Sequence, residues 1–147
     1  MNKKFLDLGL QPLANNYVNK FKKNQIKYNL KLFFNTQTKM VSISKRIPSE
    51  MMFTNNYPYR SSMSKTMRSS FYKLSLEIKR KFKPQRILEI GSNDGALIKN
   101  FNKNDVIGVE PCKNLAQITK KMGYLTYNDY WTYPLAKKIK IKNKKID

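Results

Sequence analysis

Apolar positions in the middle of the chain repeat at the spacing of an amphipathic helix. Between residues 61 and 81 they recur at intervals of three and four, with Lys and Arg among the residues between them. The positions concerned are Met67, Phe71, Leu74 and Ile78. This spacing places the apolar side chains on one face of a helix. Proline disfavours helical geometry in the residue before it, so we expect the helix to end ahead of Pro84.

The pattern changes after this proline. Short runs rich in β-branched residues at 86–90 and 106–109 each end in a polar or glycine-containing turn. The first is followed at 96–101 by apolar residues with helical spacing, and a second helix at 115–122 ends at Gly123. The order strand, glycine turn, helix, strand, helix is typical of an α/β doubly wound sheet.

The first 47 residues alternate between short apolar pieces and polar breaks. Residues 30–34 and 40–43 favour two short strands, and the turn-like segment 35–39 between them has a suitable length for a hairpin. Prolines and tyrosines at 48–59 then indicate an irregular segment.

The glycine turn at 91–95 carries the strongest candidate chemistry. Gly91 directly follows a predicted strand, where the absence of a Cβ lets the backbone approach a ligand closely. A helix that begins there would direct free N–H groups and the positive end of its dipole toward the ligand. Glu110 ends the next strand, 19 positions after Gly91, which is about where such folds place a carboxylate that binds ribose hydroxyls.

The ligand predicted for this turn is S-adenosylmethionine (SAM) rather than NAD. The turn has no third glycine to bring a pyrophosphate close, so it is not the dinucleotide fingerprint. Glu89 and Asp94 would repel a diphosphate but suit a ligand that carries a sulfonium and an ammonium group. The alternative is that the turn only reverses the chain.

Four blocks of sequence together resemble the SAM-dependent C-methyltransferases that act on nucleotide-linked deoxysugars. In chain order they are Leu-Gly-Leu-Gln-Pro-Leu-Ala-Asn at 8–15, Asn-Tyr-Pro-Tyr-Arg-Ser-Ser at 56–62, Glu-Ile-Gly-Ser-Asn-Asp-Gly at 89–95 and Gly-Val-Glu-Pro at 108–111. The resemblance covers nearly the whole chain. It implies a zinc-ribbon-like β module at 1–55, a tyrosine-rich loop and connecting helix at 56–84, and the N-terminal half of a Rossmann-like SAM-binding domain at 85–147.

The resemblance also implies a set of site residues. The cofactor would be bound by Glu89, Gly91, Ser92, Asn93, Asp94, Gly95 and Glu110. The sugar substrate would lie near Tyr57, Tyr59 and Arg60, where a tyrosine could hydrogen-bond a keto sugar or its enolate. The alternative for these tyrosines is packing of an aromatic loop on the sheet.

Two departures from the family change the expected chemistry. Asn35 and Thr38 occupy what correspond to cysteine positions of the zinc module, so we expect a degenerate module without zinc or any other metal. The lone Cys112 is expected to be a small buried residue. The chain also resembles a family member truncated at both ends, with Ile146 and Asp147 as the start of a fourth strand.

Truncation would separate the cofactor half from the catalytic half. In the family the groups proposed for proton abstraction, a histidine among them, lie beyond this point, and the chain contains no histidine. We therefore expect the isolated chain to be inactive on a nucleotide-linked keto sugar. We expect the strand at 87–90 to have an open edge, which a partner polypeptide supplying the absent strands would cover.

Composition modifies this interpretation without replacing it. The 147 residues carry 30 Lys and Arg against 9 Asp and Glu, a net charge of +21, but 25 of the basic residues are Lys. Arg makes the bidentate contacts that identify bases, so we do not expect specific nucleic-acid recognition. A small basic nucleic-acid-binding protein and a non-catalytic interaction remnant remain as alternatives. The most basic stretch, 137–145, suits an anion tether or an exposed connection.

The expected location follows from what the chain lacks. The N-terminal apolar residues are interrupted at once by Asp7 and Gly9, unlike a signal peptide, and no apolar run approaches the roughly 20 residues of a membrane helix. We expect a cytoplasmic protein with no membrane partner. One cysteine excludes an internal disulfide.

Overall fold

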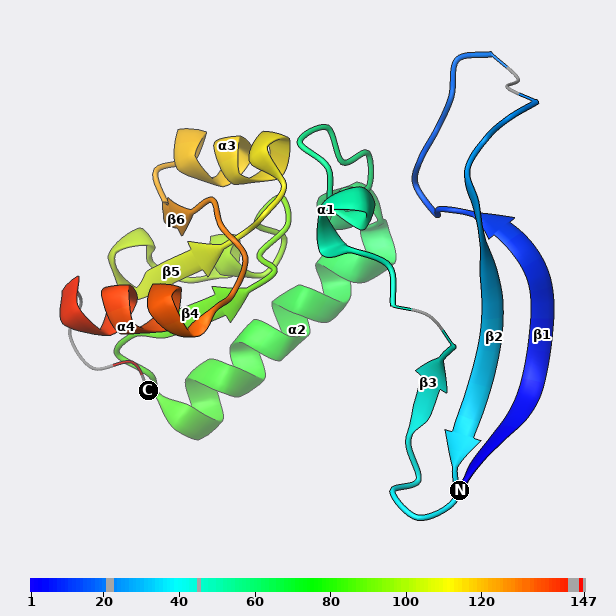
Figure 1. Cartoon of the computed structure of the whole chain (residues 1–147). Helices are drawn as coiled ribbons and strands as arrows, with labels where there is room; N and C mark the ends of the chain where they lie inside the picture. The colour runs from blue at the N-terminus through cyan, green and yellow to red at the C-terminus, as the bar shows by residue number, and fades with distance from the viewer. Residues whose placement is uncertain (21–22, 45, 143–145, 147) are drawn as a thin grey trace. The chain divides into compact units, whose positions relative to one another are not determined.

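The computed structural model describes residues 1–20, 23–44, 46–142 and 146. Its backbone forms two compact units, Met1–Met52 and Phe53–Asp147, which are described separately (Figure 1). The fold is mixed α/β: the first unit contains a three-stranded antiparallel sheet, and the second contains a three-stranded parallel sheet.

The sheet of the first unit is built on the predicted hairpin. Its strands lie in the order β1-β2-β3, and a short helix, α1, follows them. Their bounds are β1 Asn2–Pro12, β2 Lys27–Asn35, β3 Val41–Ile43 and α1 Ser49–Met52. Strand β1 was not predicted because its alternation is irregular: its register against β2 shifts twice, and Gly9 has a φ of 64°. Every described residue of this unit is at least partly exposed.

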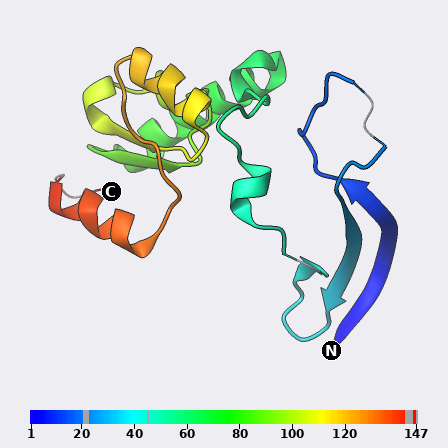
Figure 2. The same cartoon turned by 45° about the horizontal axis from the view of Figure 1, so that its top comes forward.

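The second unit consists of helices around a parallel sheet of strand order β4-β5-β6. Its elements are η1 Ser61–Met63, α2 Lys65–Phe82, β4 Ile87–Ile90, η2 Ile98–Asn100, η3 Lys103–Asp105, β5 Val106–Val109, α3 Lys113–Lys121, β6 Leu125–Tyr127 and α4 Tyr133–Lys142. Helices α3 and α4 cover opposite faces of the sheet (Figures 1 and 2). The predicted strands at 86–90 and 106–109 and the helix ending at Gly123 are confirmed, Gly123 having a φ of 88°.

Two hydrophobic clusters form the core, one on each face of this sheet. One contains Ile98, Phe101, Val106 and Tyr124, with Ile78 of α2 packed against it. The other contains Ile107, Val109, Leu135 and Ile139, which join β5 to α4. Among the described residues β4 pairs with β5 alone, so it lies at the edge of the sheet, and Ile90 is 52% exposed.

The structure confirms the predicted amphipathic helix as α2, but the residues that face the core differ in part from those predicted. Helix α2 begins after Ser64 and ends at Phe82, and the next residue, Lys83, adopts a left-handed conformation with a φ of 44° directly before Pro84. Leu74 was predicted to face the core, yet it is 41% exposed, while Ser75 is fully buried. The hydroxyl of Ser75 donates to the carbonyl of Tyr72, which satisfies this buried polar group. A small side chain thus occupies the most buried position of the helix.

The helix predicted at 96–101 is reduced to the single turn η2. Asn100 donates its side-chain amide to the carbonyls of Ala96 and Leu97, at 3.1 and 3.0 Å. These are carbonyls that a continuing helix would pair with later N–H groups. The following residue, Phe101, is extended and buried. The glycine turn therefore lacks the helix dipole that its sequence indicated.

The basic segment after residue 132 is also different from its prediction. Helix α4 replaces the expected tether or connection up to residue 142, while residues 143–145 lie outside the described chain. Ile146, predicted to start a strand, has no regular structure, and Asp147 is not described. Among the described helices, none combines the length and the apolar composition that crossing a membrane requires.

Candidate functional site

The glycine turn lies at the carboxyl end of β4 and is fastened to the neighbouring strand. The N–H groups of Gly91 and Ser92 both donate to the carbonyl of Val109, at 2.8 and 3.1 Å. Gly91, Asn93 and Gly95 have φ angles of 74°, 50° and 81°, in the left-handed region that glycine and asparagine tolerate best. The sequence therefore contains these residue types where the backbone has to reverse tightly.

The two glycines serve different purposes. A Cβ on Gly91 would have no atom within 4 Å, so this side of the backbone is open. A Cβ on Gly95 would lie 2.9 Å from the terminal methyl of Met122 and 3.0 Å from a methyl of Thr119. Gly95 is therefore required for packing against α3, whereas the surroundings of Gly91 leave room for a ligand.

Glu110 joins the turn to the end of β5. It is 4% exposed, and one carboxylate oxygen accepts the N–H of Asn93 at 2.8 Å. The other oxygen accepts the N–H of Cys112, also at 2.8 Å. The structure thus brings Glu110 and the turn together, as the spacing of 19 residues indicated. The carboxylate also stabilises the turn itself, which the sequence did not indicate.

Cys112 beside it is a neutral thiol. It is 1% exposed, as expected for a small buried residue. Burial, with the negative charge of Glu110, raises the pKa of the thiol to about 12. A protonated thiol is a poor nucleophile, so Cys112 is not a candidate for covalent chemistry.

Asn93 and Asp94 connect the turn to the segment before α2. The side-chain oxygen of Asn93 accepts the N–H of Ser61 at 2.9 Å. Asp94 is 5% exposed and accepts both the N–H of Ser62, at 3.1 Å, and its hydroxyl. Arg68 of α2 donates to the carbonyl of the same serine. The predicted cofactor turn and the predicted substrate segment are therefore parts of one hydrogen-bonded network.

The predicted substrate residues lie along this segment. Tyr57 is held at its backbone by Asn114 of α3, which accepts its N–H at 3.1 Å and donates to its carbonyl at 2.8 Å. Its ring contacts Phe53, with centroids 5.8 Å apart. Tyr59 is 46% exposed, and its carbonyl lies 3.4 Å from the side-chain nitrogen of Asn93. Arg60 is exposed. Tyr59 and Arg60 thus adjoin the turn with side chains accessible to solvent.

Ser92 is buried and Glu89 is half-buried, and each has a buried polar atom that lacks a hydrogen-bond partner in the described part of the chain. Within the described residues, one carboxyl oxygen of Glu89 and the hydroxyl of Ser92 have no hydrogen-bond partner. Burial raises the pKa of Glu89 to about 8, and the charge of Glu110 adds to this effect, while the N–H of Ile98 opposes it. Glu89 is therefore mostly protonated at neutral pH.

Glu89 and Ser92 lie on the same side of the sheet, next to Gly108 of β5. Glu89 pairs in register with Gly108, which pairs with Thr126, so all three positions face the same side of the sheet. The hydroxyl of Ser92 would lie 2.9 Å from a Cβ on Gly108. Both polar groups thus belong to a polar cluster on the α3 side of the sheet.

The electrostatics of the site favour a cationic ligand. Three of the nine acidic residues of the chain are gathered at the turn, namely Glu89, Asp94 and Glu110, and because Glu89 is mostly protonated the negative charge comes from Asp94 and Glu110. In the part of the chain that the structure describes, no Lys or Arg forms an ion pair with any of them. A positively charged group is attracted to such a site, whereas a phosphate is repelled.

Sequence reasoning missed the residues that fasten these segments together. Ser62 was part of a recognised block but was not assigned a role, and Asn114 received none. The hydrogen bonds of both residues cross between distant segments, for instance from 114 to 57. No local spacing in the sequence signals such a contact.

The structure places no predicted site residue in the first unit. Asn35 there accepts the N–H groups of Gln37 and Thr38, each at 2.9 Å, and so stabilises the hairpin turn. The described residues contain no group of three or more His, Cys, Asp or Glu side chains that could hold a metal.

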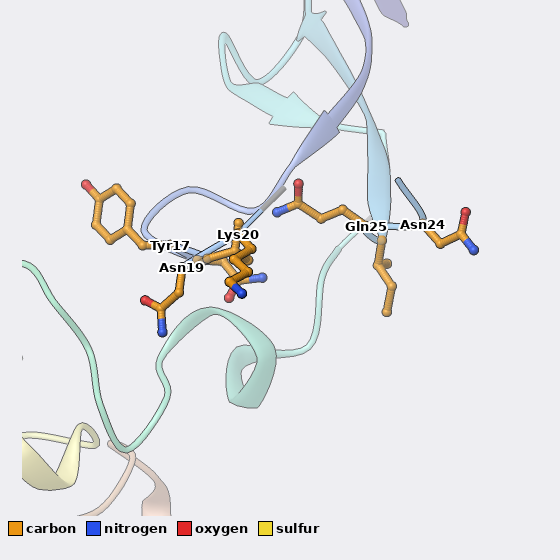
Figure 3. Close-up of a pocket in the computed structure, with 8 residues that line it drawn as sticks. Tyr17, Asn19, Lys20, Asn24 and Gln25 are labelled. Carbon is orange, nitrogen blue, oxygen red and sulfur yellow. The ribbon is translucent and has the colours of Figure 1, made fainter. Parts of the chain in front are cut away.

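The first unit also contains a hollow of about 700 Å³. It lies inside the loop between β1 and β2, and Figure 3 shows its lining side chains pointing in different directions. Residues 21–22 of the same loop lie outside the described chain. Without converging polar groups, this hollow offers no chemistry comparable with that of the turn.

Comparisons with known proteins do not assign the chain to a family. Neither models of protein families nor curated proteins match it.

Proposed function

We propose that the chain is a SAM-dependent methyltransferase-like protein that resembles the C-methyltransferases of nucleotide-linked deoxysugars. In this proposal β4, β5 and β6 form part of a Rossmann-like sheet, and the first unit is a zinc-ribbon-like module that has lost its metal ligands. The observation that carries the proposal is the hydrogen bond from the Asn93 N–H to Glu110, which joins the glycine turn to the acidic end of the next strand.

The residues at the turn suit SAM in charge and space. The cofactor carries a sulfonium and an ammonium group, which the carboxylates at this turn attract. The open side of Gly91 allows close approach to the backbone. The unsatisfied carboxyl oxygen of Glu89 provides a further polar group near the site. Bound SAM would supply the methyl group for transfer.

Each residue has a distinct proposed role. Gly91 to Gly95, with Glu89, hold the methionine and ribose portions, and Glu110 accepts hydrogen bonds from the ribose hydroxyls while it keeps the turn in place. Each carboxylate oxygen of Glu110 accepts one backbone N–H and has a second lone pair for such a bond. Tyr57, Tyr59 and Arg60 hold the keto sugar beside the cofactor.

Carbon methylation also needs a base, which must remove the proton next to the sugar ketone. The 147 residues include no histidine, the commonest general base. We propose that this base belongs to a polypeptide that completes the sheet along β4. The isolated chain should then bind SAM but transfer no methyl group, so turnover by the chain alone would contradict this part of the proposal.

Isothermal titration of SAM into the folded chain tests the cofactor site. We expect measurable binding that weakens at least tenfold in Glu110→Gln, because a hydrogen bond to a charged group contributes about 1.5–3 kcal/mol. Glu77→Gln makes the same chemical change on the exposed side of α2 and should leave binding unchanged. Circular dichroism establishes that each variant is folded.

Two results would contradict the proposal. One is the absence of binding heat at several temperatures from a sample with native circular dichroism. The other is an equal loss of affinity in Glu77→Gln and Glu110→Gln, because the effect would then reflect net charge and not the site.

A further inference from the structure

Helix α4 presents a dense positive charge and contains no acidic residue of its own. Four of its ten residues are lysines, namely Lys137, Lys138, Lys140 and Lys142, and residues 130–142 contain no Asp or Glu. Within the described chain, the ion pairs found are those of Asp7 in the first unit. The charge of α4 is therefore available to a partner.

The packing of α4 fixes which face is turned outward. Leu135 and Ile139 are 4% and 1% exposed and contact the cluster on β5. Tyr133, Lys137 and Ile141 follow one another at four-residue intervals and so share the opposite face. Because the buried residues hold the helix against the sheet, this outer face is a preformed surface.

Apolar and aromatic groups lie among the lysines of this surface. Tyr133 is 81% exposed and Ile141 is 75% exposed. Trp131, the one tryptophan in the chain, lies just before the helix and is 41% exposed. A groove runs along the helix and is lined by Pro134, Lys137, Lys138, Ile141 and Lys142. Ammonium groups thus flank an apolar strip on this face, with Tyr133 at the N-terminal end of the helix and Trp131 two residues before it.

We propose that this surface, formed by the outer face of α4 with Trp131 and Tyr133, binds single-stranded nucleic acid without sequence preference. The lysines contact phosphates, and the aromatic rings stack on bases, which is the usual combination in proteins that bind single strands. This function is separate from cofactor binding, because it involves none of the residues at the glycine turn.

The same observations disfavour two other polyanions. Reading of a duplex relies largely on arginine, and this helix has none. A helix that lies in a membrane surface inserts a broad apolar face, but Leu135 and Ile139 of α4 are already buried in the protein. Bases exposed on a single strand offer flat faces to both Trp131 and Tyr133.

Fluorescence anisotropy with a labelled 15-nucleotide oligo(dT) and the full chain tests the proposal. We expect binding that weakens with salt, accompanied by quenching of Trp131 fluorescence. The variant Lys137→Gln/Lys138→Gln/Lys142→Gln should bind at least tenfold more weakly. A plot of the logarithm of the association constant against the logarithm of the salt concentration should have a slope smaller in magnitude by about 2. Each phosphate contact to a single strand contributes about 0.7 to this slope, and the variant removes three lysines.

A matched variant separates a site from diffuse charge. Lys65→Gln/Lys73→Gln/Arg80→Gln removes three exposed charges from α2 and should weaken binding less than threefold. An equal loss in the two triple variants would overturn the proposal, because the whole basic surface would then be responsible.

Tyr133→Ala tests the stacking contribution. It should weaken oligo(dT) binding about tenfold and leave binding to heparin, a polyanion without bases, unchanged. Three outcomes would overturn the proposal: equal loss for both ligands, equally tight binding of a duplex of the same length, or tighter binding of phosphatidylglycerol vesicles at matched charge.

Discussion

Glu89 is a carboxyl group that the fold keeps protonated at neutral pH. Burial raises its pKa to about 8 from the ordinary value of 4.5. Between these two values the folded chain retains a proton that the unfolded chain has released. The free energy of unfolding therefore falls as pH rises through this window and levels off above pH 8.

Glu89→Gln should remove this dependence, because the amide resembles the protonated acid and keeps an acceptor for the N–H of Ile98. The difference in melting temperature between the variant and the original chain should increase steadily in favour of the variant from pH 5 to pH 8, by several degrees in total. Thermal unfolding followed by circular dichroism at each pH measures this. Glu77→Gln, at an exposed position, should show no such trend; parallel curves for both variants would show that Glu89 is ionised in the folded chain.

Individual residues also mark the limits of sequence reasoning. The approach of the glycine turn to Glu110 was predictable, because strand ends and turn glycines follow local rules. The hydrogen bond that Ser62 donates to Asp94 was not predictable, since it joins residues 32 apart in sequence whose approach depends on packing. Periodicity likewise could not distinguish Leu74 from Ser75 on α2, because adjacent positions differ by only 100° around a helix.

At the scale of elements, strands in the second unit were easier to predict than those in the first. The run at 106–109 is continuous and apolar, as a buried parallel strand requires, and the run at 86–90 contains three large aliphatic residues within five positions. Strand β1 is fully exposed and contains two register shifts, so its apolar residues show no regular alternation. Helix α4 was not predicted, because only two residues, Leu135 and Ile139, show the apolar spacing of its inner face and lysines dominate the rest of the segment.

The start of α2 allows a direct test of one local interaction. The hydroxyl of Ser64 accepts the N–H of Met67 at 3.2 Å and caps the helix. Ser64→Ala should lower the free energy of unfolding by about 1 kcal/mol. Ser70→Ala, exposed in the first half of the same helix, has no cap to remove and should have a smaller effect. Urea unfolding of both variants measures the difference; equal effects would show that the cap contributes nothing.

At the scale of the whole molecule, burial is concentrated in one of the two units. All fully buried residues of the described chain belong to Phe53–Asp147, and Val109 and Leu115 are 0% exposed. The first unit is a sheet whose residues all retain contact with solvent. Its hydrogen bonds therefore have fewer apolar contacts to protect them from local opening.

Hydrogen exchange should show this difference amide by amide. We expect the amides of β5 to be the slowest to exchange and those of β1 to exchange at least a hundredfold faster, because opening β1 exposes little buried apolar surface. Mass spectrometry of peptic peptides over a time course provides the measurement. Protection of β1 equal to that of β5 would show that the first unit is covered by another surface in solution.

The burial of Cys112 makes the chain well suited to site-specific labelling. Its thiol is inaccessible and fully protonated at neutral pH, so maleimide reagents should leave it unmodified. A cysteine introduced in place of Tyr17, which is 79% exposed, would then be the one reactive thiol. Energy transfer from Trp131 to a dye at that position would report the separation of the two units directly, and its change on adding SAM would show whether the cofactor alters their arrangement.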